Sequence, residues 1–276
     1  MKRNILITLA AVFVAVFLFS GAMLWQDYQD QQESAAVFDS VAELIQVETL
    51  PTTAPEMETT GSDNVTEPKE PVPVEVSAYE KYAAVYEQNN DFVGWLCIEG
   101  TNINYPVMQT PEEPNYYLKR AFDRSYSDYG VPYVQENCAL GISGNIVIYG
   151  HNMSNGSMFA DLCRSEKKSF WQEHPIIHFD TLSGYGEYEI VTVFKTVAYS
   201  QEGFKYYHFV DAESEADFDA FLAQCRELEL YDTGVDAEYG DQLITLSTCE
   251  YSRKNGRMVI VAKKIVPPAA EVGGDA

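Results

Sequence analysis

Eight short apolar segments place the strongest constraint on how this chain can fold. Glycine, proline and asparagine separate them, and they cover residues 92–98, 105–109, 130–134, 145–149, 176–179, 188–197, 242–249 and 258–264. Apolar runs of this length with turn residues between them are typical of β-strands. The sequence therefore predicts a mainly β domain, built as a barrel or a sandwich.

Two further segments have helical periodicity. Residues 79–86 place aromatic and apolar side chains at helical spacing, and residues 214–230 line up Phe218, Phe221 and Leu222 on one face among acidic residues. We expect one helix ahead of the first strand and one amphipathic helix between two late strands. The expected role of the second helix is to pack against the strands.

An uninterrupted apolar run extends from Ile5 to Trp25. At 1.5 Å per residue it reaches roughly 30 Å, about the thickness of the hydrocarbon core of a bilayer. The run is longer than the apolar region of about 7–15 residues in a signal peptide, and tryptophan is favoured at membrane interfaces. Although residues 20–22 resemble a weak cleavage site, we expect residues 5–25 to form an uncleaved transmembrane anchor.

The flanking residues predict an orientation and the domain boundaries. Lys2 and Arg3 place residues 1–4 in the cytoplasm by the positive-inside rule, so the rest of the chain lies outside the cell membrane. Residues 26–77 are acidic and rich in proline and threonine, which predicts an extracytoplasmic linker, largely extended and disordered apart from a short helix around 35–47. The globular domain is expected over 78–268 and a disordered tail over 269–276.

Charge and cysteine content exclude several classes of function. The net charge of −24 gives no basic face for nucleic acid, and it argues against general adhesion to anionic lipid. The chain has five cysteines, an odd number, and no CxxC pair. A disulfide framework, a structural zinc site and a thioredoxin-like site are therefore not expected, and at least one thiol should be free.

Cys249 is the best candidate for a reactive thiol. It lies where the apolar strand 243–249 gives way to a polar loop, so it is held on a rigid element and reachable from solvent. A nearby cation stabilises the thiolate, which is the nucleophilic form. Arg253 and Lys254 fall near the tip of the loop, whereas Arg257 opens the next antiparallel strand and can face back toward Cys249. We therefore favour Arg257 as the cation.

His151 is the histidine best placed for chemistry. It follows the apolar strand 145–149 and begins a polar loop, a position that directs a side chain into a cleft. His174, His178 and His208 lie among aromatic residues and are predicted to have structural or surface roles. The remaining cysteines, at 97, 138, 163 and 225, are predicted to act as small, mostly buried side chains.

Six short motifs can be compared with known families. They are YGHNM at 149–153, SMFADL at 157–162, TLSTC at 245–249 with Arg257, NYPVMQ at 104–109, NYYL at 115–118 and FWQEHP at 170–175. Together they resemble class B sortases, the membrane-anchored cysteine transpeptidases of Gram-positive bacteria. The resemblance covers roughly residues 79–266. It implies the eight-stranded sortase β-barrel, with an N-terminal helix and a helix before the cysteine strand.

The resemblance also implies roles for particular residues. Cys249 is the nucleophile that attacks a threonine carbonyl in a sorting motif near the C-terminus of a secreted surface protein. His151 is the general acid and base, and Arg257 stabilises the oxyanion. By the same resemblance, Tyr149, Ser247 and Glu250 are expected to line the substrate groove. The acceptor is an amine of peptidoglycan, and no metal or organic cofactor is needed.

One position departs from the pattern, and two other readings remain open. Some relatives carry an aspartate two places after the cysteine, proposed to assist the histidine, where this chain has Tyr251. Glu250 is a weak substitute. The alternatives are an extracytoplasmic cysteine peptidase or hydrolase, and a non-catalytic surface protein in which Cys249 is unreactive. Wall anchoring and pilus polymerisation are both compatible with these residues.

Overall fold

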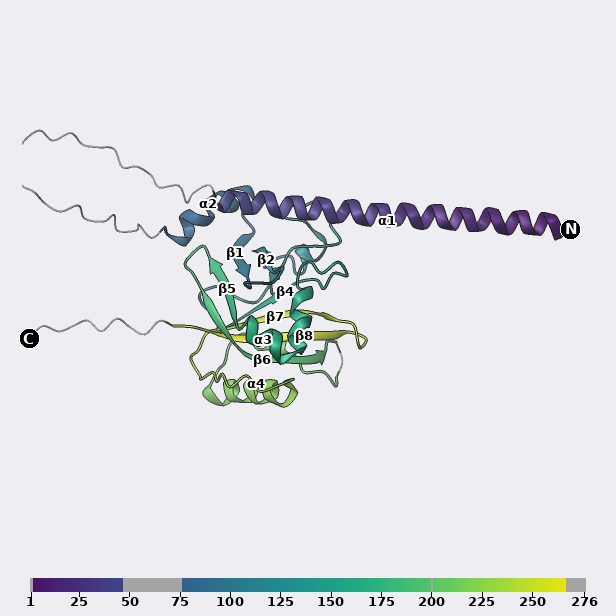
Figure 1. Ribbon diagram of the computed structural model, residues 1–276. Coiled ribbons are helices and arrows are strands. Elements are labelled where there is room, and N and C mark those ends of the chain that lie inside the picture. Colours follow the sequence, from purple (N-terminus) through teal and green to yellow (C-terminus); the bar gives the residue numbers. More distant parts are fainter. Residues whose placement is uncertain (1, 47–75, 200, 267–276) are drawn as a thin grey trace, which may run out of the picture.

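The computed structural model describes residues 2–46, 76–199 and 201–266. Its centre is a closed barrel of eight strands (Figure 1). In chain order these are β1 (Phe92–Cys97), β2 (Asn104–Met108), β3 (Tyr133–Val134), β4 (Asn145–Tyr149), β5 (Ile176–Thr181), β6 (Glu187–Val197), β7 (Leu243–Glu250) and β8 (Gly256–Lys264). Each of the predicted apolar segments overlaps one of these strands, and the predicted β-barrel is confirmed.

Two parallel pairs of neighbouring strands determine which strands end at the same end of the barrel. The order around the barrel is β1, β2, β3, β4, β7, β8, β6, β5. The pairs β2–β3 and β4–β7 are parallel, and the other adjacent pairs are antiparallel. Because parallel strands end at the same edge of a sheet, the residues that follow β4 and β7 emerge at the same end of the barrel. His151 follows β4, and Cys249 is the last residue but one of β7.

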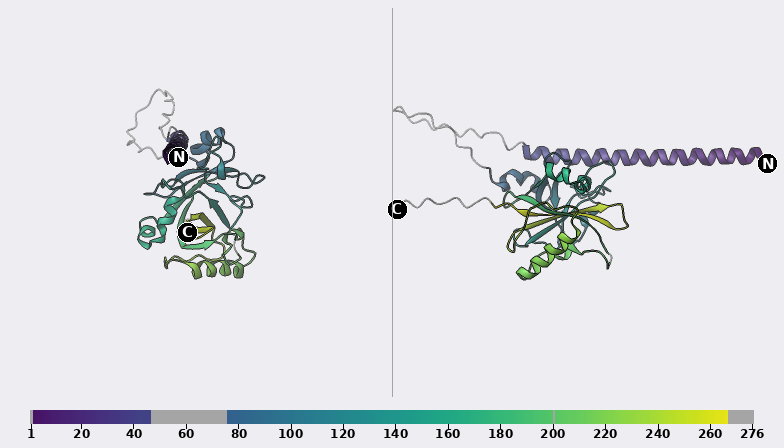
Figure 2. Two further views of the ribbon diagram at one scale, coloured as in Figure 1. Left: turned by 90° about the vertical axis from the view of Figure 1, so that its right-hand side faces the viewer. Right: turned by 60° about the horizontal axis from the view of Figure 1, so that its bottom comes forward.

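Helices cover opposite sides of the barrel, as Figure 2 shows in the view along the N-terminal helix. α1 (Lys2–Gln46) and α2 (Ala78–Gln88) lie on one side, and α4 (Glu215–Leu228) packs against β6 on the other. α4 buries Phe218, Phe221 and Cys225, and its N-terminus is capped by the side chain of Ser214. Both predicted helices of the globular domain are therefore confirmed, with α4 just before the cysteine strand.

The N-terminal helix continues far beyond the predicted anchor. We expected the helix to end at residue 25 and a largely extended linker to begin at 26, with a separate short helix around 35–47, but α1 runs unbroken to Gln46. Ser34, Phe38 and Val41 recur at helical spacing and are buried against the domain. The predicted helix around 35–47 is confirmed up to Gln46, but the extended chain predicted for 26–34 was wrong, because a narrow stripe of buried side chains was overlooked among acidic residues. The rest of the expected linker, 47–75, and the expected tail, 269–276, lie outside the described residues.

The apolar part of α1 has no contact with the barrel. Its side chains from Ile5 to Trp25 are exposed, and α1 is the one described helix long and apolar enough to cross a membrane. Further along, the ring of Phe38 packs edge-on against Tyr105 of β2, with ring centroids 5.1 Å apart. The helix therefore has an exposed apolar half and a docked half.

Four short helices escaped prediction. They are the 3₁₀ helices η2 (Tyr116–Lys119), η3 (Ala160–Glu166) and η4 (Tyr206–His208), and α3 (Lys168–Glu173). Segments of three to seven residues are too short to show a helical repeat in sequence, and 3₁₀ turns are common connectors. Two of them, η2 and η4, contribute to the site described below.

Candidate active site

Cys249 and Arg257 form one rung of the β7–β8 ladder. Residues directly opposite each other in an antiparallel pair project to the same face of the sheet, so the thiol and the guanidinium share a face. Cys249 is partly exposed, whereas Arg253 and Lys254 lie in the exposed turn beyond the ladder. Arg257 is therefore the cation that the strand pairing fixes beside the thiol. Arg253 and Lys254 lie outside that pairing.

The turn before Arg257 explains this register. Asn255 adopts a left-handed conformation with φ 59°, which asparagine tolerates better than most residues. At Gly256 a Cβ would lie 2.3 Å from the main-chain oxygen of Glu250. Only glycine permits that approach, so the Asn255-Gly256 pair closes the hairpin tightly and sets Arg257 opposite Cys249.

Among the described residues, no acidic side chain neutralises the positive charge of Arg257. Its Nη1 donates to the carbonyl of Gly256 at 2.9 Å, and the guanidinium carbon lies 5.8 Å from the centroid of the Tyr199 ring. Across residues 4–45, 76–199 and 201–266, no carboxylate forms an ion pair with this arginine. The guanidinium can therefore serve an external carbonyl or oxyanion.

His151 reaches the same end of the barrel through the parallel β4–β7 pairing. Its Nε2 lies 2.8 Å from the main-chain oxygen of Leu118 in η2. Since a carbonyl only accepts, Nε2 carries the hydrogen, and in the neutral ring Nδ1 is the nitrogen left to take up a proton. Gly150 makes the preceding turn possible, because a Cβ there would lie 2.5 Å from the ring of Phe159.

Comparison with known proteins identifies the family of the chain. Residues 96–265, more than half of the chain, match the profile of the sortase domain. The chain belongs to the sortase family. The sortase shares 31% identity with Sortase B of Staphylococcus aureus (strain NCTC 8325 / PS 47) over 188 residues, which cover 67% of this chain and 75% of that protein.

Further relatives extend the match along the sortase. Sortase B of Listeria monocytogenes serovar 1/2a (strain ATCC BAA-679 / EGD-e) is 29% identical over 262 residues, 94% of this chain and 96% of the relative. Among solved structures, the Staphylococcus aureus sortase B–substrate complex has a TM-score of 0.69 at 25% identity, covering 86% of this chain and 98% of that one. The expected class B resemblance is confirmed, and this sortase is a cysteine transpeptidase.

Tyr149 and Ser247 lie on the floor of the sortase site. They are paired in the β4–β7 ladder, and Ser247 shares the face of Cys249 two residues along the strand. Ser247 is only 1% exposed, and its hydroxyl shares a 2.6 Å hydrogen bond with the phenol of Tyr206. The Tyr149 hydroxyl donates to Gln135. The hydroxyls of Tyr149 and Ser247 are therefore bonded within the protein, and the two side chains pack beneath the sheet face that carries Cys249.

The carboxylate of Glu250 binds Ser252 and Lys195 and does not contact His151. Its carboxylate accepts hydrogen bonds from the main chain and the hydroxyl of Ser252, at 3.0 and 2.6 Å, and lies 3.8 Å from the ammonium of Lys195. Burial works to raise the pKa of Glu250, but the Ser252 hydrogen bonds and nearby cations bring it below its usual value. The backbone carbonyl of Leu118, and not this carboxylate, is the partner of the His151 ring.

Sequence reasoning missed an aromatic wall around the sortase site. Tyr133 stands beside Tyr149 with ring centroids 5.6 Å apart, and burial raises the pKa of Tyr133. Tyr206, which rises from η4, is 1% exposed. At the rim, Tyr199 is 81% exposed and has a φ of 58°, strained for an aromatic residue. Only the density of aromatics in the sequence at 204–209 could have signalled part of this wall.

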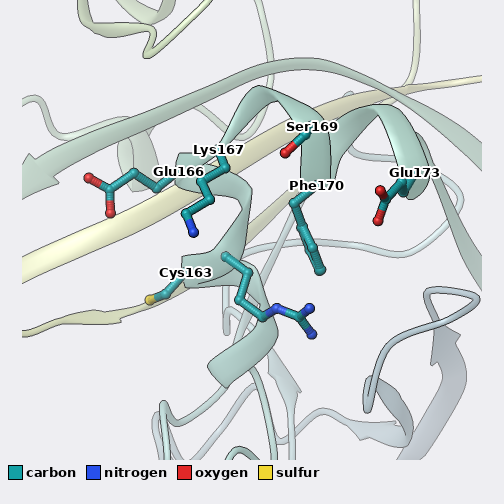
Figure 3. Close-up of a pocket in the computed structure, with 7 residues that line it drawn as sticks. Cys163, Glu166, Lys167, Ser169, Phe170 and Glu173 are labelled. Atoms are coloured by element: carbon teal, nitrogen blue, oxygen red, sulfur yellow. The ribbon is translucent and has the colours of Figure 1, made fainter.

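A second thiol lies behind the main chain of Cys249. The sulfur of Cys163 is 3.7 Å from the carbonyl oxygen of Cys249. Figure 3 shows Cys163 at the edge of a pocket of about 240 Å³ beside η3 and α3, lined also by Arg164, Glu166, Lys167, Ser169, Phe170 and Glu173. All five cysteines are free thiols. Within the described residues, no group of three or more His, Cys, Asp or Glu side chains could hold a metal ion.

Proposed function

We propose that this sortase is a membrane-anchored transpeptidase that cleaves a C-terminal sorting motif after threonine and transfers the acyl group to a peptidoglycan amine. One observation carries the proposal: Cys249 and Arg257 share a rung of the β7–β8 ladder at the barrel end where His151 emerges. A nucleophile, a fixed cation and a proton carrier on one face are the components that acyl transfer requires.

The first half-reaction forms a thioester. The thiolate of Cys249 attacks the threonine carbonyl, and the guanidinium of Arg257 donates to the oxygen as negative charge develops on it. Removing one oxyanion donor in comparable sites costs roughly 10²–10³-fold in rate. His151, protonated on Nδ1, gives its proton to the leaving amine as the peptide C–N bond breaks. The downstream peptide departs, and the upstream protein stays attached to Cys249.

The second half-reaction releases the product. Neutral His151 now accepts a proton at Nδ1 from the incoming peptidoglycan amine, whose nitrogen attacks the thioester. The new amide C–N bond forms as the C–S bond breaks, and the thiolate is regenerated. Transfer to water instead of the amine would make the enzyme a peptidase, so exclusion of water from the thioester decides the outcome.

Substrate contacts are proposed for the faces next to Cys249. Glu250 and Tyr199 lie at the surface next to Cys249 and Arg257, while Tyr149 and Ser247 lie beneath that surface and shape it from within. Secreted surface proteins that carry a sorting motif are the proposed donors. The similar Staphylococcus aureus protein of known structure is a sortase B–substrate complex, which supports a substrate-binding site on this chain.

Residues 5–25 are proposed to anchor the enzyme in the cell membrane, with the N-terminus in the cytoplasm and the catalytic domain outside. The apolar half of α1 is long enough to span a bilayer. The two basic residues that precede it favour this orientation. Labelling of the exposed thiol of Cys249 in intact cells with a membrane-impermeant reagent would test the orientation.

The activity is tested with the full chain in detergent, a threonine-containing sorting peptide and an amine acceptor. A mixed acyl–amine product that disappears in Cys249→Ala is the expected result. Hydrolysis without transfer would support the peptidase alternative. A Cys249 that no thiol reagent labels at neutral pH would support the non-catalytic alternative.

A further inference from the structure

Three side-chain hydrogen bonds tie the loop that carries His151 to the strand that carries Cys249. The regular ladder between β4 and β7 ends where the amide of Gly150 donates to Ser247, at 3.2 Å. Beyond it, Thr248 Oγ1 donates to the carbonyl of Gly150 at 2.8 Å. Asn152 Nδ2 donates to the carbonyl of Cys249 at 2.8 Å, and the Tyr251 hydroxyl donates to the carbonyl of Asn152 at 2.9 Å.

These bonds enclose the histidine. Gly150 and Asn152 are its two chain neighbours, and both are attached to β7 or to the residue just beyond it. We propose that Asn152 and Tyr251 are positioning residues, which together form a clasp that fixes the His151 loop against the Cys249 strand. The proposal rests on the function proposed above, in which His151 exchanges protons at the Cys249 thioester.

Asn152 is held at two separate points. Its side-chain amide donates a hydrogen bond to the carbonyl of Cys249. Its main-chain carbonyl accepts a hydrogen bond from the hydroxyl of Tyr251, which lies two residues after Cys249. One point of attachment would fix a distance and leave the loop free to rotate, whereas two points also fix its orientation. The clasp therefore sets the direction in which the His151 ring leaves the backbone.

Contacts on the far side keep the clasp in place. Asn152 Nδ2 also lies 3.3 Å from the sulfur of Cys163, so both amide hydrogens have partners and the amide plane is fixed. The amide of Phe159 donates to the carbonyl of His151 at 2.8 Å. Because this bond spans the loop, the Phe159 amide reports whether the loop is held or free.

Tyr251 stands where some relatives carry an aspartate, and it acts differently from a carboxylate. A carboxylate near the histidine would stabilise its charged form. A phenol is neutral over the working pH range, and partial desolvation of its hydroxyl, with nearby Cys249, raises the pKa of Tyr251. Its hydroxyl is bonded to the loop backbone and not to the imidazole, so its effect on His151 is through position.

The variants that test the clasp are Tyr251→Phe and Asn152→Ala, with Tyr239→Phe as the matched control. Tyr251 is 73% exposed and Tyr239 51% exposed, so neither loss of a hydroxyl opens a cavity. A displacement of about 1 Å in an active site can cost on the order of 10²-fold in rate. We expect Tyr251→Phe to lower kcat about 5- to 20-fold and Asn152→Ala about 10²-fold, with KM within about twofold.

Two readouts separate positioning from other roles. In Tyr251→Phe, hydrogen exchange at the Phe159 amide should accelerate while the unfolding midpoint matches that of Tyr239→Phe. The pH–rate profile should keep both limbs at reduced height, because a positioning residue exchanges no proton. Loss of the alkaline limb would make Tyr251 a proton donor instead, and a rise in KM at constant kcat would make it a substrate contact. Either result would overturn the proposal.

Hydrogen exchange needs no substrate, so this readout stands apart from the proposed activity. If the wild-type enzyme fails to transfer any peptide while Phe159 exchange still responds to Tyr251→Phe, the clasp is real and the proposed reaction is wrong. If transfer proceeds in the wild type but neither kcat nor exchange changes in the variants, the reaction stands and the clasp is refuted.

Discussion

Cys249 and Arg257 face each other across a single antiparallel rung, and the guanidinium is stacked over Tyr199 without a carboxylate partner among the described residues. The strand backbone fixes the position of the cation relative to the thiol, so little reorganisation is needed when charge develops on the substrate. Such preorganised electrostatics are usually the largest single contribution to catalysis.

This relationship predicts the effect of replacing the arginine. Arg257→Lys keeps the charge but loses the planar pair of donors, and kcat/KM for peptide transfer should fall about 10²-fold, with Arg257→Ala falling about 10³-fold. Arg253→Ala in the exposed turn removes the same charge as Arg257→Ala, and as the control it should stay within twofold. Equal losses at residues 253 and 257 would mean that general positive charge, and not the rung geometry, supports the reaction.

The two neighbouring thiols should differ sharply in reactivity. Burial, followed by the charge of Glu250, raises the pKa of Cys163 to about 11. A raised thiol pKa keeps the group protonated, so at pH 8 only about one Cys163 in 10³ is thiolate. Cys163 is partly exposed, so small reagents can reach it.

Iodoacetamide labelling followed by peptide mass mapping checks this difference. At pH 7–8 the label should appear on Cys249, and labelling of Cys163 should rise about tenfold per pH unit up to pH 11. Cys249→Ala provides the background for the second site. Rapid labelling of Cys163 at neutral pH in that variant would contradict the expectation.

Gly150 gives a prediction about the histidine loop. In Gly150→Ala the new methyl group would lie 2.5 Å from the rigid ring of Phe159, so the loop or the ring must move. Overpacking of this kind typically costs about 1–3 kcal/mol of stability, and the shift of His151 should reduce kcat by more than tenfold.

The matched control is Gly184→Ala, because nothing lies within 4 Å of a Cβ at Gly184. Its melting temperature and activity should equal those of the parent protein. An active Gly150→Ala enzyme with unchanged kcat would show that the loop adapts without moving the imidazole.

Tyr206 predicts a loss of stability at high pH. Burial raises the pKa of Tyr206 to about 12, although the hydrogen bond from Ser247 opposes the shift. The folded pKa lies above the unfolded value near 10, so the neutral phenol stabilises the fold fully below pH 10, and this contribution is lost as the pH rises from 10 to 12. The size of the effect is on the order of 2 kcal/mol.

Urea unfolding at pH 8 and pH 11 measures this contribution. The decrease in unfolding free energy between the two pH values should be smaller in Tyr206→Phe than in the wild type. Tyr239→Phe, at an exposed position, should show the full wild-type decrease. If the two variants lose the same stability, the alkaline sensitivity belongs to other buried tyrosines.

The strands and the β7–β8 pair could be predicted because their signals are local. Apolar runs between turn residues mark each strand, and Asn255-Gly256 marks the hairpin that brings Arg257 back to Cys249. The β4–β7 pairing joins segments about a hundred residues apart, and no local pattern encodes a parallel partner. The proximity of His151 to Cys249 therefore followed from family resemblance alone.

Other parts of the site depend on irregular segments. Leu118 contributes only its carbonyl oxygen to His151, a contact that no side-chain pattern can reveal. Tyr206 is held under Ser247 by the short helix η4. In α1, three buried residues spaced by three or four positions were hidden in a segment whose overall composition is acidic.

If residues 5–25 span a membrane as proposed, the continuity of α1 sets the height of the domain above it. Ser34 is buried against the domain, and nine residues of helix after the end of the apolar run at Trp25 span about 14 Å. The β7–β8 hairpin points along α1 toward its N-terminus in Figure 1. Tyr129 is within electrostatic range of Asp27 and Asp30, and it accepts a hydrogen bond from Asn155 in the His151 loop.

With residues 5–25 in the bilayer, α1 works as a rigid spacer and not as a tether. The end of the barrel that carries the β7–β8 hairpin then faces the lipid surface, at a distance set by the length of the helix. A polypeptide still retained in the same membrane would meet Cys249 close to where it leaves the bilayer, and adding or removing one helical turn between Trp25 and Ser34 would move that meeting point by about 5 Å.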